Sequence, residues 1–512
     1  MEIREEIGME PRVPSITRVS QKNGSLYIEC EDRADKSIII GTGGWVVGKL
    51  ASRLGYKEVK VDSRLDNIIK TKMLMESNKR LDDLDDYDFV QFSKAMIHGR
   101  QPYPMMSYVL GEENLWICGF LEHYGCRPKL VHTEFIHDNV KRAYNNTDFL
   151  RVDCDLSPYR DRLHEMVGYV LTEHGSDNTP VMMGLFEKSL EQKNDAILVE
   201  PMMFYCMDHW RAKRFSKKRF KTNVFSGTDM NRAYMVERVL NWSFLGLIEP
   251  TDAARIVHSH WPNDSEIIKV EKREIDQFSR SFRVGNSLRR AKEISQEAYA
   301  LLKNILTGSS DHVNLKTLVA WSGGIDSTAC IRMIDETGLS PDLITVMMPH
   351  IDKEEVRAKA NDWELDLIEL DPPPAVSELY DEVENGNIHP CGKCSSLMEN
   401  TVKEYALENE YEAIVFGDLL SVGSQSIYEE EGILHLNLPA ALSMPKRELI
   451  QRLDEELKVG FGCPLVNIAH ERRRDAQRIS VQRVLRELRA QMLDQELALE
   501  IIRDIKSQAE NI

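Results

Sequence analysis

The 512-residue chain lacks the features of membrane proteins and of disulfide-stabilised secreted proteins. No apolar run approaches the roughly eighteen residues that a membrane-spanning helix requires. The first residues, MEIREEIGMEPR, are too polar and acidic for a signal peptide. Nine cysteines are too few for a disulfide scaffold, so most of them are expected to be buried in a reducing compartment. These absences predict a cytoplasmic protein with no membrane contact.

The chain also has fewer positive than negative charges, with 65 Lys and Arg against 83 Asp and Glu. The net charge of −18 argues against a protein that coats nucleic acid indiscriminately, although a basic face could still occur on an acidic body. Hydrophobic residues make up 42% of the chain and charged residues 29%, which are the proportions of an ordinary globular protein. The length allows about two to four domains.

The two halves of the chain differ in their strand and helix patterns. From about residue 314 apolar strands alternate with helices, which predicts an α/β domain with a parallel sheet and right-handed crossovers. The N-terminal half shows mixed α/β patterning of unknown fold. We therefore predict four segments: an N-terminal α/β region that could bind substrate or nucleic acid, a helical connector, the regular domain and a helical tail, over 1–265, 266–313, 314–466 and 467–512.

Several single elements can be predicted from periodicity and flanking residues. In the N-terminal half we expect a short buried strand, a helix and a second strand, over 37–40, 45–54 and 58–61. In the C-terminal half the expected strands are 316–321, 342–348, 365–370, 412–416 and 433–437. The expected helices between the first three of these strands are 326–337 and 353–362.

The strongest motif is LVAWSGGIDST at residues 318–328, where an apolar strand runs into two glycines and a helix. Glycines let backbone N–H groups approach phosphate oxygens, and a helix N-terminus adds partial positive charge. Asp326 could cap the helix or hold magnesium against a pyrophosphate. The residues expected to bind nucleotide here are Ala320, Ser322, Gly323, Gly324, Asp326, Ser327 and Thr328.

This stretch resembles the S-G-G-x-D-S/T signature of the N-type ATP pyrophosphatases, the PP-loop superfamily, at every signature position. The resemblance implies an adenine nucleotide alpha hydrolase-like (HUP) domain in the C-terminal half. It also implies cleavage of ATP between the α and β phosphates with Mg²⁺, and transfer of AMP to a substrate oxygen. Asp326 would then be catalytic, and Met347 would lie on the strand that offers backbone groups to adenine.

Later positions resemble the tRNA 4-thiouridine synthetases of that superfamily. Gly417 and Asp418 follow a strand, and the stretch through 424–426 (SQS) is similar to the pattern of those enzymes. Lys446 opens a helix, where it could steady pyrophosphate or be an ordinary first-turn residue. No segment resembles the THUMP domain that many of these enzymes carry.

Three cysteines form the second candidate site. Cys391 and Cys394 make a C-x-x-C pair, and Cys463 follows near the end of the domain. Their order resembles the cluster-dependent tRNA thiolation enzymes, which implies a [4Fe–4S] cluster with one iron free for sulfide. Zn²⁺ with an open position is an alternative, as are a persulfide and disulfide pair or three unrelated buried thiols. His389 could add a ligand or be a plain loop residue.

The N-terminal half contains a near match to two nucleotide motifs. Residues 41–50, GTGGWVVGKL, miss G-x-G-x-x-G because Val46 replaces the third glycine, and miss the P-loop because Leu50 replaces Ser/Thr. Asp62 stands at the spacing of a ribose-binding acid. A tight structural turn is the favoured interpretation.

Two basic segments stand out in the acidic chain. Residues 210–221, WRAKRFSKKRFK, interleave cations with aromatic rings that could stack on unpaired bases. A solvated helix with a buried aromatic stripe is the alternative. The second segment comprises Arg472, Arg473, Arg474, Arg478, Arg483 and Arg486.

These features together predict an ATP-dependent adenylating enzyme that inserts sulfur into a tRNA base, with Asp326, Cys391 and Cys394 as catalytic residues. Its expected partners are ATP, tRNA or another nucleobase-containing substrate, and a sulfide or persulfide donor, and a homodimer is among the expected assemblies. Two alternatives remain: a ligase or amidotransferase acting on a small molecule, and a regulatory protein that binds ATP without turnover.

Overall fold

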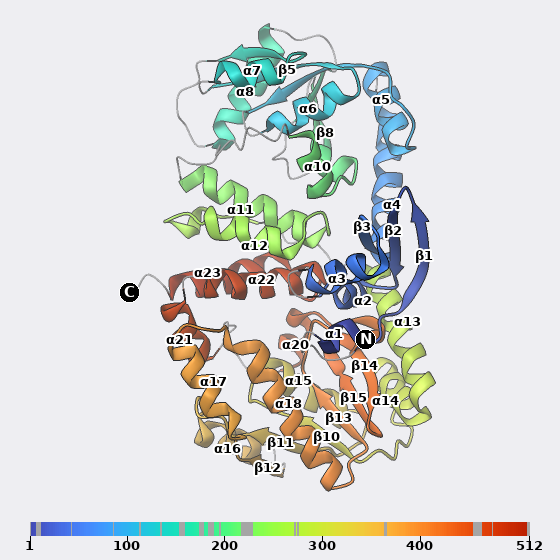
Figure 1. Ribbon diagram of the computed structural model, residues 1–512, viewed down its shortest axis with the longest axis vertical. Helices are drawn as coiled ribbons and strands as arrows, with labels where there is room; N and C mark the ends of the chain where they lie inside the picture. The colour runs from blue at the N-terminus through green and yellow to red at the C-terminus, as the bar shows by residue number, and fades with distance from the viewer. Residues whose placement is uncertain are drawn as a thin grey trace. The chain divides into compact units, whose positions relative to one another are not determined.

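The computed structural model is shown in Figure 1. It describes residues 2–6, 12–41, 44–84, 86–111, 114–133, 136–152, 159–173, 179–182, 189–193, 196–216, 229–270, 273, 276–362, 366–453, 463–473 and 475–508. The chain forms two compact units, which we call unit 1 (Met1–Asn67 with Lys272–Ile512) and unit 2 (Ile68–Glu271). No helix among the residues just given is long and apolar enough to cross a membrane.

Unit 1 contains a parallel sheet with one antiparallel edge strand. Its strand order is β12-β11-β10-β13-β15-β14, and only β14 runs antiparallel to its neighbour. The strands are β10 (Thr317–Ala320), β11 (Asp342–Val346), β12 (Leu367–Leu370), β13 (Ala413–Phe416), β14 (Ile427–Glu430) and β15 (Ile433–Asn437). The five expected strands are therefore confirmed to within two residues at each end.

Helices cover both faces of this sheet. The helices of this part of unit 1 are α13 (Gln277–Ile294), α14 (Gln296–Thr307), α15 (Ile325–Asp335), α16 (Lys353–Asp362), α17 (Ala375–Glu384), α18 (Pro390–Glu408), α19 (Leu438–Ala441), α20 (Lys446–Arg452), α21 (Pro464–Arg472), α22 (Ala476–Arg489) and α23 (Gln495–Ser507). The helix over 353–362 is confirmed, and the one expected over 326–337 is α15.

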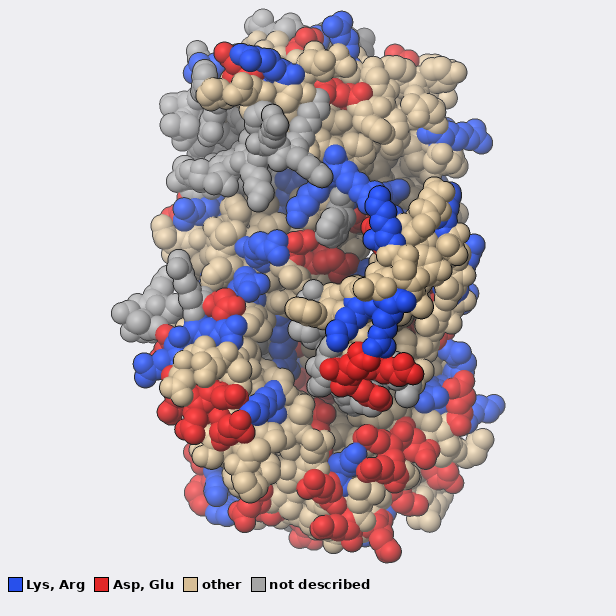
Figure 2. Space-filling view, viewed as in Figure 1, with Lys and Arg blue, Asp and Glu red and all other residues tan. Residues whose placement is uncertain are grey.

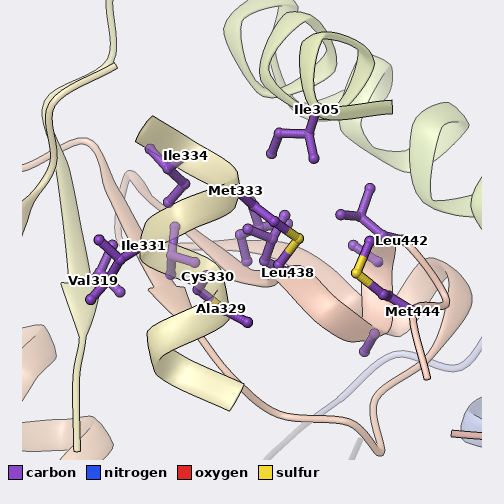
Figure 3. Close-up of a cluster of buried hydrophobic side chains, with 14 of the residues drawn as sticks. Ile305, Val319, Ala329, Cys330, Ile331, Met333, Ile334, Leu438, Leu442 and Met444 are labelled. Carbon is purple, nitrogen blue, oxygen red and sulfur yellow. The ribbon is translucent and has the colours of Figure 1, made fainter. Parts of the chain in front are cut away.

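Alternate residues of β10 build two separate cores, because successive strand side chains point to opposite faces. Val319 packs in one cluster with α14, α15 and α19, and Figure 3 shows Ile305, Met333 and Leu442 meeting there. Leu318 packs in the other cluster, with α17, α18 and α21. These two cores fix the end of β10, and with it the start of α15.

Unit 1 also holds a three-stranded sheet of order β1-β2-β3. Its strands are β1 (Ile16–Lys22), β2 (Ser25–Cys30) and β3 (Glu58–Ser63), and its helices are α1 (Glu2–Glu6), α2 (Arg33–Ile40) and α3 (Trp45–Leu54). The predicted helix over 45–54 and strand over 58–61 are confirmed. The predicted strand over 37–40 is wrong, because these residues end α2.

The reason is a capping box at the start of α2. Asp32 caps the helix, and its own N–H donates to Asp35 Oδ2 at 3.1 Å. This reciprocal cap offsets the weak helix preference of three consecutive isoleucines.

Buried polar contacts join residues 1–67 to the C-terminal half within unit 1. Arg283 Nε donates to Asp32 Oδ2 at 2.9 Å, and both side chains are 1% exposed. Gln425 Nε2 donates to Asp35 Oδ1 at 2.8 Å. The strand and helix patterns did not indicate this grouping, since they assigned residues 1–67 to one region with 68–265.

Unit 2 is a second α/β body with a mostly parallel sheet of order β6-β5-β4-β7-β9-β8, in which β8 is antiparallel to β9. Its strands are β4 (Met106–Leu110), β5 (Arg127–His132), β6 (Asp148–Arg151), β7 (Thr179–Met182), β8 (Leu190–Lys193) and β9 (Ala196–Val199). Its helices are α5 (Tyr87–Ile97), α6 (Leu115–His123), α7 (Asp138–Ala143), α8 (Tyr159–Glu173), α9 (Pro201–Phe204), α10 (His209–Phe215), α11 (Asp229–Phe244) and α12 (Pro250–Ser259), while α4 (Arg64–Arg80) leads in from unit 1.

Candidate functional site

The glycine turn between β10 and α15 has the geometry of an anion-binding loop. Gly323 adopts φ +74°, a left-handed conformation that favours glycine. Gly324 is the N-cap residue of α15 and provides no side chain to bond the first N–H groups of the helix. Ser322 and Gly324 are exposed. The first turn of α15 can therefore receive an anion from solvent.

Two of the predicted hydroxyl groups hold the loop itself. Ser327 Oγ accepts from the Ser322 N–H at 3.3 Å and donates to the Gly324 carbonyl at 3.2 Å. Thr328 Oγ1 accepts from Trp321 Nε1 at 3.0 Å. Ser327 and Thr328 thus stabilise the turn, while Ser322 is the exposed hydroxyl of the set.

Asp326 and Lys446 meet at the start of α15. Lys446 Nζ lies 2.6 Å and 2.7 Å from the two carboxylate oxygens of Asp326. The sequence singled out both residues for nucleotide binding, and the structure brings them together although 120 positions separate them.

Gly417 explains how closely β13 approaches this loop. A Cβ atom at residue 417 would lie 2.8 Å from the backbone nitrogen of Ser327 and 2.9 Å from the carbonyl carbon of Asp326. Only glycine fits this spacing without a shift of α15. The next residue, Asp418, accepts hydrogen bonds from the Leu420 N–H at 3.2 Å and Ser421 Oγ at 3.0 Å.

Two other predicted nucleotide residues lie at the ends of their strands. Ala320 is the last residue of β10. Met347 directly follows β11, is 2% exposed, and donates its N–H to the Leu370 carbonyl at 2.8 Å. Its N–H is therefore engaged with the neighbouring strand, and an adenine contact through the other backbone groups of this segment stays a prediction.

The three cysteines of the second candidate site come from two helix starts. Cys391 and Cys394 lie in the first turn of α18, and Cys463 is the N-cap residue of α21. Burial, then the nearby Cys463 and Cys391, raise the pKa of Cys394 to about 11. Burial is also the main cause that raises the pKa of Cys391, with Cys463 contributing. The fold therefore brings the three sulfur atoms into one neighbourhood.

These cysteines do not form a ready metal site. Within the parts of the chain that the structure describes, no three His, Cys, Asp or Glu side chains converge as ligands of one ion. The donor chemistry of the three thiols suits zinc or an iron–sulfur cluster.

Helix α22 links the two candidate sites. Burial raises the pKa of the Cys391 thiol, and the nearby Arg483 opposes this shift. Desolvation disfavours the charged guanidinium, but Glu487, Cys391 and Asp418 together raise the pKa of Arg483. Arg483 is therefore near both Cys391 and Asp418.

Two further residues of α22 extend this charged group. Desolvation lowers the pKa of Arg486, and the nearby Asp418 opposes this shift. Burial raises the pKa of Glu487, while Arg483 and Lys446 lower it. The sequence had indicated Arg483 and Arg486 only as part of a basic segment, and nothing had indicated Glu487. The sequence signal that could have indicated Glu487 is its position four residues after Arg483, which allows an ion pair along a helix.

His389 is engaged in a buried hydrogen-bond chain. Its Nε2 lies 2.9 Å from Ser480 Oγ, which lies 2.8 Å from His470 Nε2. Burial, followed by the nearby His470, lowers the pKa of His389 to about 4. The structure thus favours a structural role for His389 over a fourth metal ligand.

The near-miss nucleotide motif forms helix caps and an ion pair. Gly41 donates its N–H to the Ser37 carbonyl at the end of α2, Gly44 precedes α3, and Lys49 lies 3.7 Å from Glu6. Thr42, Gly43, residues 217–221, Phe461, Gly462 and Arg474 lie outside the described residues.

Comparison with known proteins identifies a relative. No protein-family model matches the chain. The chain is 30% identical over 261 residues to "Uncharacterized protein MJ1638" of Methanocaldococcus jannaschii. The match covers 47% of this chain and 98% of that protein.

Proposed function

We infer that this chain, which belongs to the same protein family as MJ1638 of Methanocaldococcus jannaschii, is an ATP-dependent adenylating enzyme. It converts ATP to AMP and pyrophosphate and inserts sulfur into a tRNA base. Residues 314–466 are proposed as a HUP-like nucleotide domain, and the parallel order of β12-β11-β10-β13-β15 supports this assignment.

One observation carries the proposal. Arg483 is near enough to the Cys391 thiol and the Asp418 carboxylate for both groups to raise its pKa, and Asp418 follows the glycine packed on the predicted phosphate loop. A nucleotide loop and a thiol group that share one arginine can act on the same substrate.

In the proposed reaction the turn at 322–324 and the start of α15 hold the β and γ phosphates. Asp326 would hold magnesium, and Lys446, displaced from Asp326, would face the phosphates. A carbonyl oxygen of the base attacks the α phosphorus, the bond to the bridging oxygen breaks, and pyrophosphate leaves. A sulfur nucleophile then attacks the carbon that carries the adenylated oxygen. The bond between this carbon and the oxygen breaks, and AMP departs with that oxygen. The chain contributes positioning and fixed charge.

Cys391, Cys394 and Cys463 are proposed as the sulfur-handling residues. When bound to them, a [4Fe–4S] cluster would supply an iron without a protein thiolate, and Zn²⁺ is the alternative. This part of the proposal depends on the donor set alone. Both pKa shifts imply thiols that are protonated at neutral pH, so metal loading would release protons.

The acceptor RNA is proposed to contact unit 2 through α10. Arg211, Lys213 and Arg214 are exposed on this helix. The surface of unit 1 offers a contrast, since acidic side chains crowd the part near α16 and α17 (Figure 2). Cations on α10 would neutralise phosphates locally in a chain whose net charge is −18.

The test begins with anaerobic purification, followed by iron, zinc and acid-labile sulfide analysis of wild type, Cys463→Ala and Cys330→Ala. We expect iron and sulfide in near-equal amounts in wild type and in Cys330→Ala, whose cysteine is fully buried in α15, and loss of both in Cys463→Ala. Thionucleosides would then be measured in tRNA after incubation with ATP and sulfide.

Pyrophosphate release with zinc, or without metal, and without thionucleosides would favour a small-molecule ligase. ATP binding without any pyrophosphate release would favour the regulatory alternative.

A further inference from the structure

The two units repeat one sheet topology. In each sheet the first strand is central, with the second and third on one side and the fourth on the other. A hairpin of the fifth and sixth strands follows, and the fifth is the antiparallel edge. The crossover helices also correspond, except that unit 1 has α17 in addition to α18 before its fourth strand. Six strands can be ordered in many ways, so this agreement indicates a common design.

The hydrogen-bond register aligns the two central turns residue by residue. In unit 2 the Gly111 N–H donates to the Val131 carbonyl at 3.0 Å. In unit 1 the Trp321 N–H donates to the Ile344 carbonyl at 2.8 Å. Each donor is the first residue after its central strand, and each helix, α6 or α15, begins four residues later. The turns therefore have equal length.

The ends of the two sheets match in backbone conformation as well. Cys206 and Ser443 adopt φ +46° and +45°, an uncommon region for residues other than glycine. The next residue, Met207 or Met444, donates its N–H to a carbonyl five positions earlier, at 2.8 Å and 2.9 Å. Helices α10 and α20 then begin three residues after Cys206 and Ser443. The two units therefore agree in backbone conformation at this end as well as in strand order.

The aligned positions of unit 2 lack the groups that would hold phosphate. By sequence, Glu112, Glu113 and Asn114 stand where unit 1 has Ser322, Gly323 and Gly324. Likewise Trp116, Ile117, Cys118 and His209 stand where unit 1 has Asp326, Ser327, Thr328 and Lys446. Ile117 and Cys118 are fully buried and fill the start of α6 with apolar groups. Two glutamates in the sequence at positions aligned with a serine and a glycine add negative charge, which disfavours an anion.

We propose that residues 106–215 are a divergent second copy of the fold of residues 317–452, that this copy has lost its phosphate site, and that each chain therefore binds one ATP. The single-site prediction rests on the proposed function of unit 1. The duplication itself stands on topology and register. It explains why the N-terminal half shows α/β patterning without a nucleotide motif.

The experiment is equilibrium dialysis of the full chain with labelled non-hydrolysable ATP and magnesium, for wild type, Ser322→Glu and Glu112→Ser. Ser322 is exposed, so a glutamate there introduces the residue type of the aligned position 112 without disturbing the core. We expect one site per chain in wild type and in Glu112→Ser, and at least a tenfold loss of affinity in Ser322→Glu. Circular dichroism would verify that the variants are folded.

Two sites in wild type would overturn the inference while leaving the proposed function intact. A single site that survives in Ser322→Glu and changes affinity in Glu112→Ser would also overturn it, because the nucleotide would then lie in unit 2. Failure of wild type to bind any nucleotide would overturn the proposed function, and with it the single-site prediction.

Discussion

Lys446 Nζ lies 2.6 Å from Asp326 Oδ1 and 2.7 Å from Asp326 Oδ2, so the ammonium group bonds both oxygens of one carboxylate. The pair closes the start of α15 beside a turn whose N–H groups have no side-chain cap. The Lys446 ammonium group thus neutralises a carboxylate that would otherwise repel phosphate. In the proposed function, magnesium bound with ATP would take the place of this ammonium group beside Asp326.

The first prediction concerns Asp326. We expect Asp326→Ala to lower ATP-dependent pyrophosphate release by about 100-fold or more, because the variant lacks the carboxylate proposed to hold magnesium against the phosphates. Release is measured with a coupled phosphate assay. Asp335→Ala, an exposed aspartate at the other end of α15, is the matched control and should keep wild-type turnover. Equal rates in both variants would remove Asp326 from the site.

Gly417 tests the close approach of β13. In Gly417→Ala the new methyl group would overlap the backbone of Ser327 and Asp326, at a cost of about 1–3 kcal/mol for overpacking. Moving α15 should weaken nucleotide binding by about tenfold or more, which isothermal titration calorimetry can measure. Gly285→Ala in α13 meets no atom within 4 Å and should bind normally. Unchanged affinity in Gly417→Ala would show that the loop tolerates the shift.

Charge on α10 provides a third prediction. Replacement of Arg211, Lys213 and Arg214 by glutamate should weaken tRNA binding. It should also reduce the slope of the logarithm of the binding constant against the logarithm of the salt concentration, by about 0.7–0.9 for each phosphate that the helix no longer neutralises. Filter binding over a range of salt concentrations measures both. The control reverses three other exposed arginines of unit 2, namely Arg100, Arg127 and Arg142. Similar losses of affinity in both triple variants would indicate a nonspecific charge effect.

His209 predicts a pH dependence of stability. Burial, then the nearby Lys213, lower the pKa of His209 to about 4, below its ordinary value of 6.5. Between these values the unfolded chain binds more protons than the folded chain. Stability should therefore fall as pH drops from 6.5 towards 4, by up to about 3 kcal/mol from this residue.

Urea unfolding of wild type and His209→Gln at several pH values measures this effect. The variant should lose less stability than wild type on acidification, while at neutral pH the two should respond alike to small pH changes. His98→Gln, at an exposed histidine of unit 2, should follow wild type throughout. Parallel pH profiles for wild type and His209→Gln would contradict the assigned pKa.

Local sequence patterns predicted many helices and strands of unit 1, because interactions between residues close in the chain determine these elements. The helix over 45–54 and the alternating elements after residue 314 follow from hydrophobic periodicity and glycine placement. The turn at 322–324 could be predicted because a short turn between a strand and a helix restricts both its length and its residue types. The run at 37–40 was misassigned, since a capping pair at its start outweighs the preference of isoleucine for strands.

Tertiary structure decided the rest, because the deciding contacts join residues far apart in the chain. No pattern near Arg483 predicts that it reaches both Cys391 and Asp418, and none near Asp32 predicts its buried partner Arg283. The repeat of the sheet in unit 2 is also invisible in the sequence, because strand order depends on spacing and burial that many residues can satisfy. A phosphate loop requires specific residues, so the sequence alone could predict one at 322–324. A fold tolerates many different residues at most positions, so the proposed second copy in unit 2 became visible only in the three-dimensional structure.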